Sequence, residues 1–137
     1  MEFKEWVILE SKKTVVSFDF DGVLHQSMVE GTTHPDQFVS ADLEPRPDIH
    51  KKVRSEAKKH SLVVVTARDH GSEKIVWEFL DKHLSGLFQE VYTTHGGSKV
   101  GILEKIGAIR HYDDKDLTED LKNSSVSFVH SPLFPNT

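Results

Sequence analysis

The sequence predicts an α/β fold in which helices cover both faces of a mainly parallel sheet, a three-layer α/β/α sandwich. The first observation is a set of short apolar runs, such as Val15–Phe20 and Leu62–Val65, that fit strands buried on both faces. The second is that stretches with helical spacing of apolar residues alternate with these runs along the chain. The crossovers between parallel strands are expected to be right-handed.

The length and composition indicate a single globular domain, residues 1–137. Hydrophobic residues make up 36% and charged residues 28% of the chain, as in ordinary globular proteins. The net charge of −5 argues against binding nucleic acid through bulk charge but leaves a local basic groove open. The chain has no cysteine, which excludes disulfides and cysteine-ligated zinc. It has neither an apolar run long enough for a membrane nor a signal-peptide pattern. We therefore expect no membrane partner and a cytoplasmic location, and leave the oligomeric state open.

The first third of the chain contains one clear strand. Residues 1–13 favour a helix over the alternative, an edge strand at Trp6–Leu9. Val15–Phe20 is the first strand. Residues 25–44 are polar, with a glycine, a proline and no helical period. A stretch of this length without its own helix is usually functional, so we expect a flap or short hairpin over the strand ends.

The remaining elements alternate regularly. Pro47 and Asp48 suit the first turn of a helix. Its basic side chains are expected to form a solvated face rather than a nucleic-acid patch. Gly107 suits the end of a later helix. In chain order we expect a helix that begins at Pro47 and has an apolar stripe of Ile49, Val53 and Ala57, a strand over Leu62–Val65, a helix over about Ser72–Leu84, a strand over Gln89–Thr93, a helix over Lys99–Ile106, a strand over Ile109–Tyr112, a short helix over Lys115–Lys122 and a strand over Val126–Val129.

Two carboxylates follow the first strand. Asp19 and Asp21 are two positions apart, so both side chains point to the same side of the strand end. Two close carboxylates repel unless a cation lies between them, and Mg²⁺ prefers a few carboxylates together with phosphate oxygens and water. A plain Asp-Gly turn is the alternative. A calcium-binding EF-hand loop is excluded because Val23 and Leu24 stand where it needs an oxygen ligand and a glycine.

Polar residues also follow two later strands. Thr66 and Arg68 come after the second strand, and Asp113 and Asp114 after the fourth. Ligands of parallel α/β sheets bind at the carboxyl ends of the strands. We therefore expect these residues to converge in space with Asp19 and Asp21.

The segments in this order resemble the haloacid dehalogenase (HAD) superfamily of phosphohydrolases, which has a Rossmann-like sheet. The resemblance extends over Val15–Val129 and is closest to nucleotidases and polynucleotide 3′-phosphatase domains. Lys99 is preferred to Lys105 as the third motif because it lies at a helix start. The four motifs are Asp19–Leu24, the strand that ends in Thr66, the lysine at Lys99, and Asp113 with Asp114.

The resemblance implies a catalytic role for four residues. Asp19 would attack phosphorus and form an aspartyl-phosphate. Asp21 would protonate the leaving oxygen and then activate water, which requires that its site raise its pKa. Thr66 would donate a hydrogen bond to a phosphate oxygen, and Lys99 would hold the nucleophile and neutralise phosphate charge.

The same resemblance implies an Mg²⁺ site. The ion would lie between Asp19, the backbone carbonyl of Asp21, and Asp113. Asp114 is either a second ligand or an acceptor that supports the ligands, and the two readings stay open.

The substrate is the least defined part of the prediction. No insertion large enough for a cap domain separates the motifs, so the site should be open. An open site suits a large substrate, such as a nucleic-acid end or a phosphoprotein, or else needs a second subunit as a lid. The resemblance of the Thr66–Arg68 and Asp113–Asp114 segments to nucleotidases and polynucleotide 3′-phosphatases favours a nucleotide or polynucleotide end. A small-metabolite phosphatase and a non-catalytic phosphate-binding module are the alternatives. Arg68 is a candidate for a second phosphate or for a surface salt bridge, and His25 for the leaving group or for a solvent-facing position.

Overall fold

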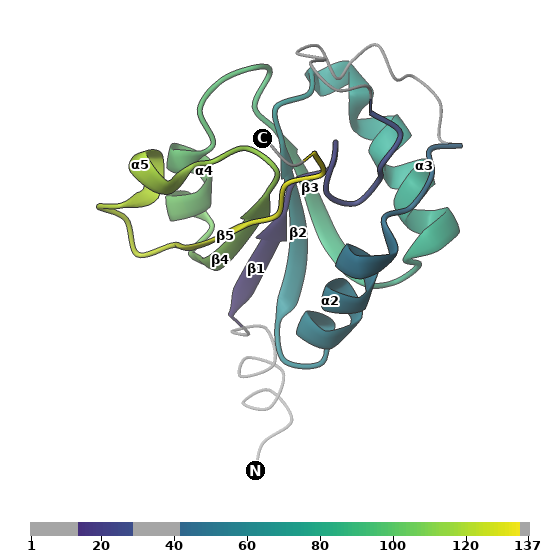
Figure 1. Cartoon of the computed structure of the whole chain (residues 1–137), viewed down its shortest axis with the longest axis horizontal. Coiled ribbons are helices and arrows are strands. Elements are labelled where there is room, and N and C mark those ends of the chain that lie inside the picture. Colours follow the sequence, from purple (N-terminus) through teal and green to yellow (C-terminus); the bar gives the residue numbers. More distant parts are fainter. Residues whose placement is uncertain (1–13, 29–41, 135–137) are drawn as a thin grey trace, which may run out of the picture.

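The computed structural model describes residues 14–28 and 42–134, and it contains a five-stranded parallel sheet (Figure 1). The strand order is β3-β2-β1-β4-β5, which places β1 at the centre. All four strand pairings are parallel, as the near-continuous apolar runs predict. The strands are β1 (Val15–Phe18), β2 (Ser61–Thr66), β3 (Phe88–Thr93), β4 (Ala108–Asp113) and β5 (Ser127–His130).

Helices cover both faces of the sheet, which confirms the predicted α/β sandwich. One face carries α2 (Pro47–Ala57) and α3 (Glu73–His83), which follows a short 3₁₀ turn, η2 (His70–Ser72). The other face carries α4 (Val100–Lys105) and α5 (Thr118–Leu121). No helix in these two described ranges is long and apolar enough to cross a membrane.

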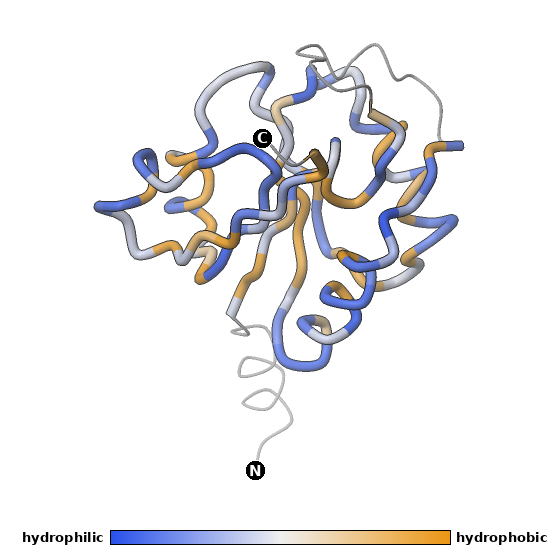
Figure 2. The backbone as a smooth tube through the Cα atoms, viewed as in Figure 1, coloured by the Kyte–Doolittle hydropathy of each residue, from blue (hydrophilic) through white to orange (hydrophobic). Residues whose placement is uncertain are grey.

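The core is divided by the sheet into two apolar layers. Along β2, Leu62 and Val64 pack with α2 and α3, whereas Val63 and Val65 pack with α4 and α5. Successive side chains of a strand point to opposite faces, so a strand covered on both sides must be apolar at every position. Figure 2 shows the same pattern, with hydrophobic strands inside and hydrophilic stretches on the helices.

Most element ends differ from the prediction by one residue, and two larger differences have local reasons. β1 ends at Phe18 because the backbone carbonyl of Phe20 accepts bonds from the N–H groups of Val23 and Leu24, which begin a turn. The last helix begins at Thr118 instead of Lys115. Carboxylates hold the residues before it in a loop: Asp113 accepts from the Lys115 N–H and Asp116 from the Thr118 N–H.

The predicted flap is described only at its ends. The Gln26 N–H donates to the Glu44 carbonyl at 2.8 Å, and the Arg46 N–H donates to the Leu24 carbonyl at 3.1 Å. The two ends therefore run antiparallel, as the two legs of a hairpin do, and they meet beside the end of β1. The rest of the flap, 29–41, and the predicted helix in 1–13 lie outside the described residues.

Candidate active site

The carboxyl ends of the strands form one side of a cavity of about 950 Å³. Six of the predicted site residues line it, and they come from the ends of four segments that are far apart in sequence. Arg68 and His25 are not among the lining residues. The six are Asp19, Asp21, Thr66, Lys99, Asp113 and Asp114.

Three carboxylates in this cavity are close enough to share one cation. Asp19, Asp113 and Asp114 each offer an oxygen, and these oxygens lie within 4.8 Å of one another. The turn after β1 makes room for this cluster. Gly22 has a φ of +77°, and a Cβ at this position would lie 2.6 Å from Oδ2 of Asp114. A glycine is required here both by the backbone angle and by the neighbouring carboxylate.

Lys99 connects two members of the cluster. Its Nζ lies 3.1 Å from Oδ1 of Asp19 and 2.6 Å from Oδ2 of Asp113. Burial opposes the charge on this lysine, but the two carboxylates outweigh burial and raise its pKa. Lys105, the other lysine of this segment, is exposed at the end of α4. The structure therefore places Lys99, and not Lys105, at the carboxylates.

The cluster carries more negative than positive charge. Burial, followed by the charge of Asp113, raises the pKa of Asp19 well above its usual value. The same two causes raise the pKa of Asp114 to about 6. The pKa of Asp113 is lowered, because Lys99 and then His111 outweigh the effect of its burial. The ammonium of Lys99 thus favours the ionised form of Asp113, whereas Asp19 and Asp114 need a further cation to ionise as readily.

Asp113 is oriented by residues that the sequence analysis missed. Its Oδ2 lies 2.9 Å from Nε2 of His111, and Nδ1 of that ring lies 2.7 Å from the hydroxyl of Ser17. Both partners are fully buried in the middle of strands. The signal was present in the sequence, since a histidine two positions before an acid on a buried strand shares its face.

Asp21 is held in a different environment. Arg68 donates from Nε to Oδ2 at 2.9 Å and from Nη2 to Oδ1 at 2.8 Å, and Nε2 of His25 lies 2.8 Å from Oδ1. Burial opposes the charge on Asp21, but the bonds from His25 and then from Arg68 lower its pKa. The raised pKa that the acid role of Asp21 requires is therefore not found in this arrangement, in which the pKa is lowered.

The predicted positions of Arg68 and His25 also need correction. Both side chains have no exposed surface, so neither the surface salt bridge nor the solvent-facing histidine is present. The Arg68 guanidinium lies 5.2 Å from the centre of the Phe20 ring, and its Nη1 has no partner in the described part of the chain. Both residues bind the carboxylate of Asp21, and neither lines the cavity, so their predicted contact with substrate stays a prediction. The sequence pattern could not show this, because an arginine after a strand can point either way.

Thr66 lines the cavity, and its hydroxyl accepts a hydrogen bond from the Arg68 N–H at 3.3 Å.

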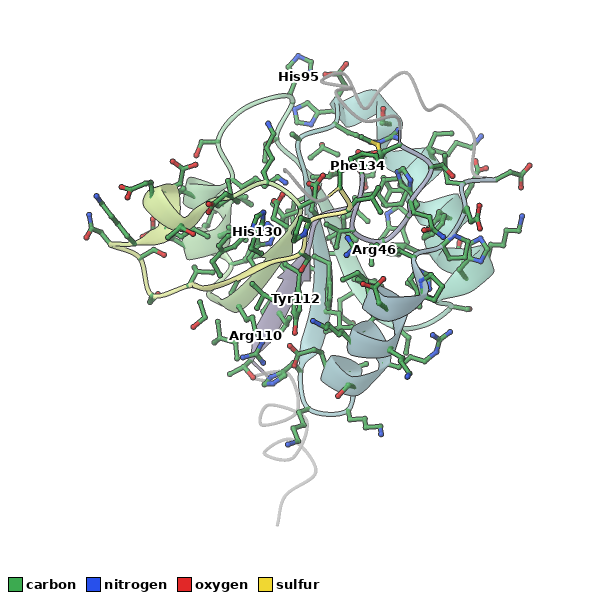
Figure 3. All side chains as sticks on the ribbon, in the orientation of Figure 1. Arg46, His95, Arg110, Tyr112, His130 and Phe134 are labelled. Atoms are coloured by element: carbon green, nitrogen blue, oxygen red, sulfur yellow. The ribbon has the colours of Figure 1, made fainter. Side chains whose placement is uncertain are left out.

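The side chain of Arg46, which the sequence analysis also missed, joins the turn after β1 to the end of β5. Arg46 donates from Nη1 to the carbonyls of Gly22 and Ser131, both at 2.7 Å (Figure 3). The Asp19–Gly22 turn is thus fixed by buried hydrogen bonds from outside the cavity.

The fold and this site define the chain as a parallel α/β protein with an acidic cavity at the carboxyl edge of its sheet. Two solved structures have a similar fold. One is a chain of the Pnkp1/Rnl/Hen1 RNA repair complex, with a TM-score of 0.68 and 14% identity over 91% of this chain and 44% of that chain. The second is a chain of the Pnkp1/Rnl/Hen1 complex, with a TM-score of 0.71 and 12% identity over 92% of this chain and 47% of that one.

At these identities the likeness concerns the fold, and this chain spans less than half the length of either neighbour. No family model matches the sequence, and no curated protein is detectably similar to it.

Proposed function

We propose that this chain is a Mg²⁺-dependent, HAD-type phosphatase that hydrolyses a phosphomonoester on a nucleotide or polynucleotide end. The observation that carries the proposal is the convergence of Asp19, Asp113 and Asp114 on Lys99 at the wall of one cavity. A carboxylate nucleophile, a lysine and a cation site are the groups that transfer of a phosphoryl group to an aspartate requires. The fold shared with chains from an RNA repair complex supports the choice of a polynucleotide end.

The first half of the reaction joins Asp19 to phosphorus. Lys99 and the N–H of Phe20 both lie against Oδ1 of Asp19, so we assign the attack to Oδ2. The bond from Oδ2 to phosphorus forms while the bond from phosphorus to the leaving oxygen breaks. We assign binding of the phosphoryl oxygens to the ammonium of Lys99 and the hydroxyl of Thr66, because both residues line the cavity.

The second half returns Asp19 to its starting state. In the described arrangement the low pKa of Asp21 makes it a carboxylate, the form that accepts a proton from the attacking water. The water oxygen bonds to phosphorus while the bond from phosphorus to Oδ2 of Asp19 breaks, which releases inorganic phosphate and restores Asp19. For protons to balance over one cycle, Asp21 has to carry a proton once substrate is bound, give it to the leaving oxygen in the first half, and regain one from the attacking water in the second.

The donor set fits a hard divalent cation. Three carboxylate oxygens within 4.8 Å of one another, with no nitrogen or sulfur ligand among them, suit Mg²⁺ better than softer metals. Asp19, Asp113 and Asp114 would hold the ion, together with the backbone carbonyl of Asp21. When bound, Mg²⁺ would supply positive charge for the phosphate oxygens and lower the pKa of Asp19 and Asp114.

A direct test is hydrolysis of p-nitrophenyl phosphate with and without Mg²⁺, with Asp19→Asn as the inactive control. Hydrolysis that needs both Mg²⁺ and Asp19 supports the proposal. Binding of inorganic phosphate without any hydrolysis would instead indicate a non-catalytic phosphate-binding module. A panel of 3′-phosphorylated oligonucleotides, mononucleotides and sugar phosphates then defines the substrate. A preference for sugar phosphates would indicate a small-metabolite phosphatase.

A further inference from the structure

Two histidine rings are stacked at the rim of the cavity, outside the catalytic cluster. The rings of His70 and His95 lie with their centres 5.4 Å apart and their planes 16° apart. Both residues are exposed, and His95 keeps 65% of its side chain in solvent. Their chain neighbours Asp69 and Gly96 line the cavity, so the pair lies directly beyond its wall.

The pair is held in place by one bond from the loop after β2 and one from the last residue of β3. Nδ1 of His95 lies 2.8 Å from Oδ1 of Asp69, and Nδ1 of His70 is hydrogen-bonded to the hydroxyl of Thr93. His95 has a φ of +53°, which is uncommon for a residue other than glycine and is fixed by a bond from its N–H to the carbonyl of Arg68 at 3.1 Å. Figure 3 shows His95 at the outer end of the loop after β3.

The surroundings favour recognition of bases over recognition of backbone phosphates. The described residues that line the cavity include seven aspartates but only two basic residues, Lys99 and Lys115. A polynucleotide that reaches Asp19 can therefore make few phosphate contacts besides the one that reacts. The face of an aromatic ring binds any base by stacking, at no cost in charge repulsion.

We propose that His70 and His95 form a stacking platform for an unpaired base of a single-stranded polynucleotide whose terminal phosphate enters the cavity. The inference rests on the proposed function and narrows its substrate to a single-stranded end. The exposed face of His95 receives the base, and His70 supports this ring from behind. The bonds from Asp69 and Thr93 hold the rings in their stacked orientation.

The test compares variants that remove or keep a ring. His95→Asn removes the ring and retains a residue that tolerates positive φ. His70→Phe keeps a ring, whereas His70→Ala removes it. His60→Ala is the matched control, because His60 lies beside the start of β2 at the opposite edge of the sheet. The probe is a trinucleotide with a 3′-phosphate and a 2-aminopurine base, whose fluorescence is quenched by stacking. Binding is measured in the Asp19→Asn background, and kcat/KM with Asp19 intact.

His95→Asn and His70→Ala should weaken binding of the trinucleotide by about 5- to 100-fold and abolish the quenching. His70→Phe and His60→Ala should retain both. Hydrolysis of glycerol phosphate, which has no ring to stack, should be unchanged in all four variants. Equal trinucleotide affinity in His95→Asn and His60→Ala would overturn the inference, even if every variant remains a phosphatase. Quenching that depends on His95 in a protein without hydrolytic activity would instead uphold the platform and refute the proposed function.

Discussion

Gly22→Ala provides a sharp test of the acidic cluster. The added Cβ would meet Oδ2 of Asp114 at 2.6 Å, well inside van der Waals contact, so the carboxylate must rotate away. The alanine at position 22 would also have to adopt a φ of +77°, which costs about 1–2 kcal/mol for this residue type. The smaller entropy of the unfolded chain offsets up to about 1 kcal/mol of this cost. The backbone effect alone should therefore lower the free energy of unfolding by roughly 1 kcal/mol.

Gly86→Ala separates the backbone effect from the contact. Gly86 has almost the same φ, +79°, and a Cβ there would meet nothing within 4 Å. Both variants should lose similar stability in urea unfolding, but only Gly22→Ala should disturb Asp114. Because Mg²⁺ demands close to ideal octahedral geometry, we expect its affinity to fall by about 10- to 100-fold in Gly22→Ala. Calorimetric titration with Mg²⁺ measures this without relying on activity. Equal Mg²⁺ affinity in the two variants would refute the assignment of Asp114 to the cation site.

Three further predictions concern the groups to which we assign the proposed catalysis. Asp19→Asn should keep the fold and lower kcat by about 10²–10⁴-fold or more, since an amide does not attack phosphorus; activity within tenfold of the parent, with an unchanged circular-dichroism spectrum, would contradict this. EDTA should abolish hydrolysis, and Asp113→Ala should raise the Mg²⁺ concentration needed for half-maximal rate; full activity in excess EDTA would exclude the metal. The lowered pKa of Asp21 stabilises the fold above about pH 3.9, and this contribution is lost as the pH falls through the folded pKa. Urea unfolding followed from pH 7 down to well below pH 3.9 should therefore show a shallower acid loss in Arg68→Met than in the parent.

The fold was predictable because its signals are local and repeated. The run from Leu62 to Val65 is apolar at every position, and only a strand covered on both faces requires that. The convergence of Asp19, Thr66 and Asp113 followed from topology alone, since parallel strands bring their carboxyl ends to one edge. The element ends were less accurate, because side-chain bonds such as that from Asp116 to Thr118 decide where a short helix begins.

The hydrogen-bond partners of the Asp21 carboxylate could not be predicted from the order of strands and helices. The positions of Arg68 and His25 relative to Asp21 depend on side-chain directions after the strand ends, which no periodicity fixes. Arg68 is completely buried, and a buried guanidinium needs a carboxylate partner. The sequence contains both the guanidinium of Arg68 and the carboxylate of Asp21, but only the packed structure shows that the two bind each other.

The two acids of the first motif are separated by one residue but are neutralised by different means. Asp21 has its cation built into the chain, as the Arg68 guanidinium, and it keeps its charge without any bound ion. Asp19 shares Lys99 with Asp113, and its burial, followed by the charge of Asp113, raises its pKa despite that lysine. A divalent ion bound there would favour the ionised, nucleophilic form of Asp19 and leave Asp21 almost unaffected. The activity of such a site would then depend on the metal at the nucleophile, while Asp21 is already the carboxylate that accepts a proton from the attacking water.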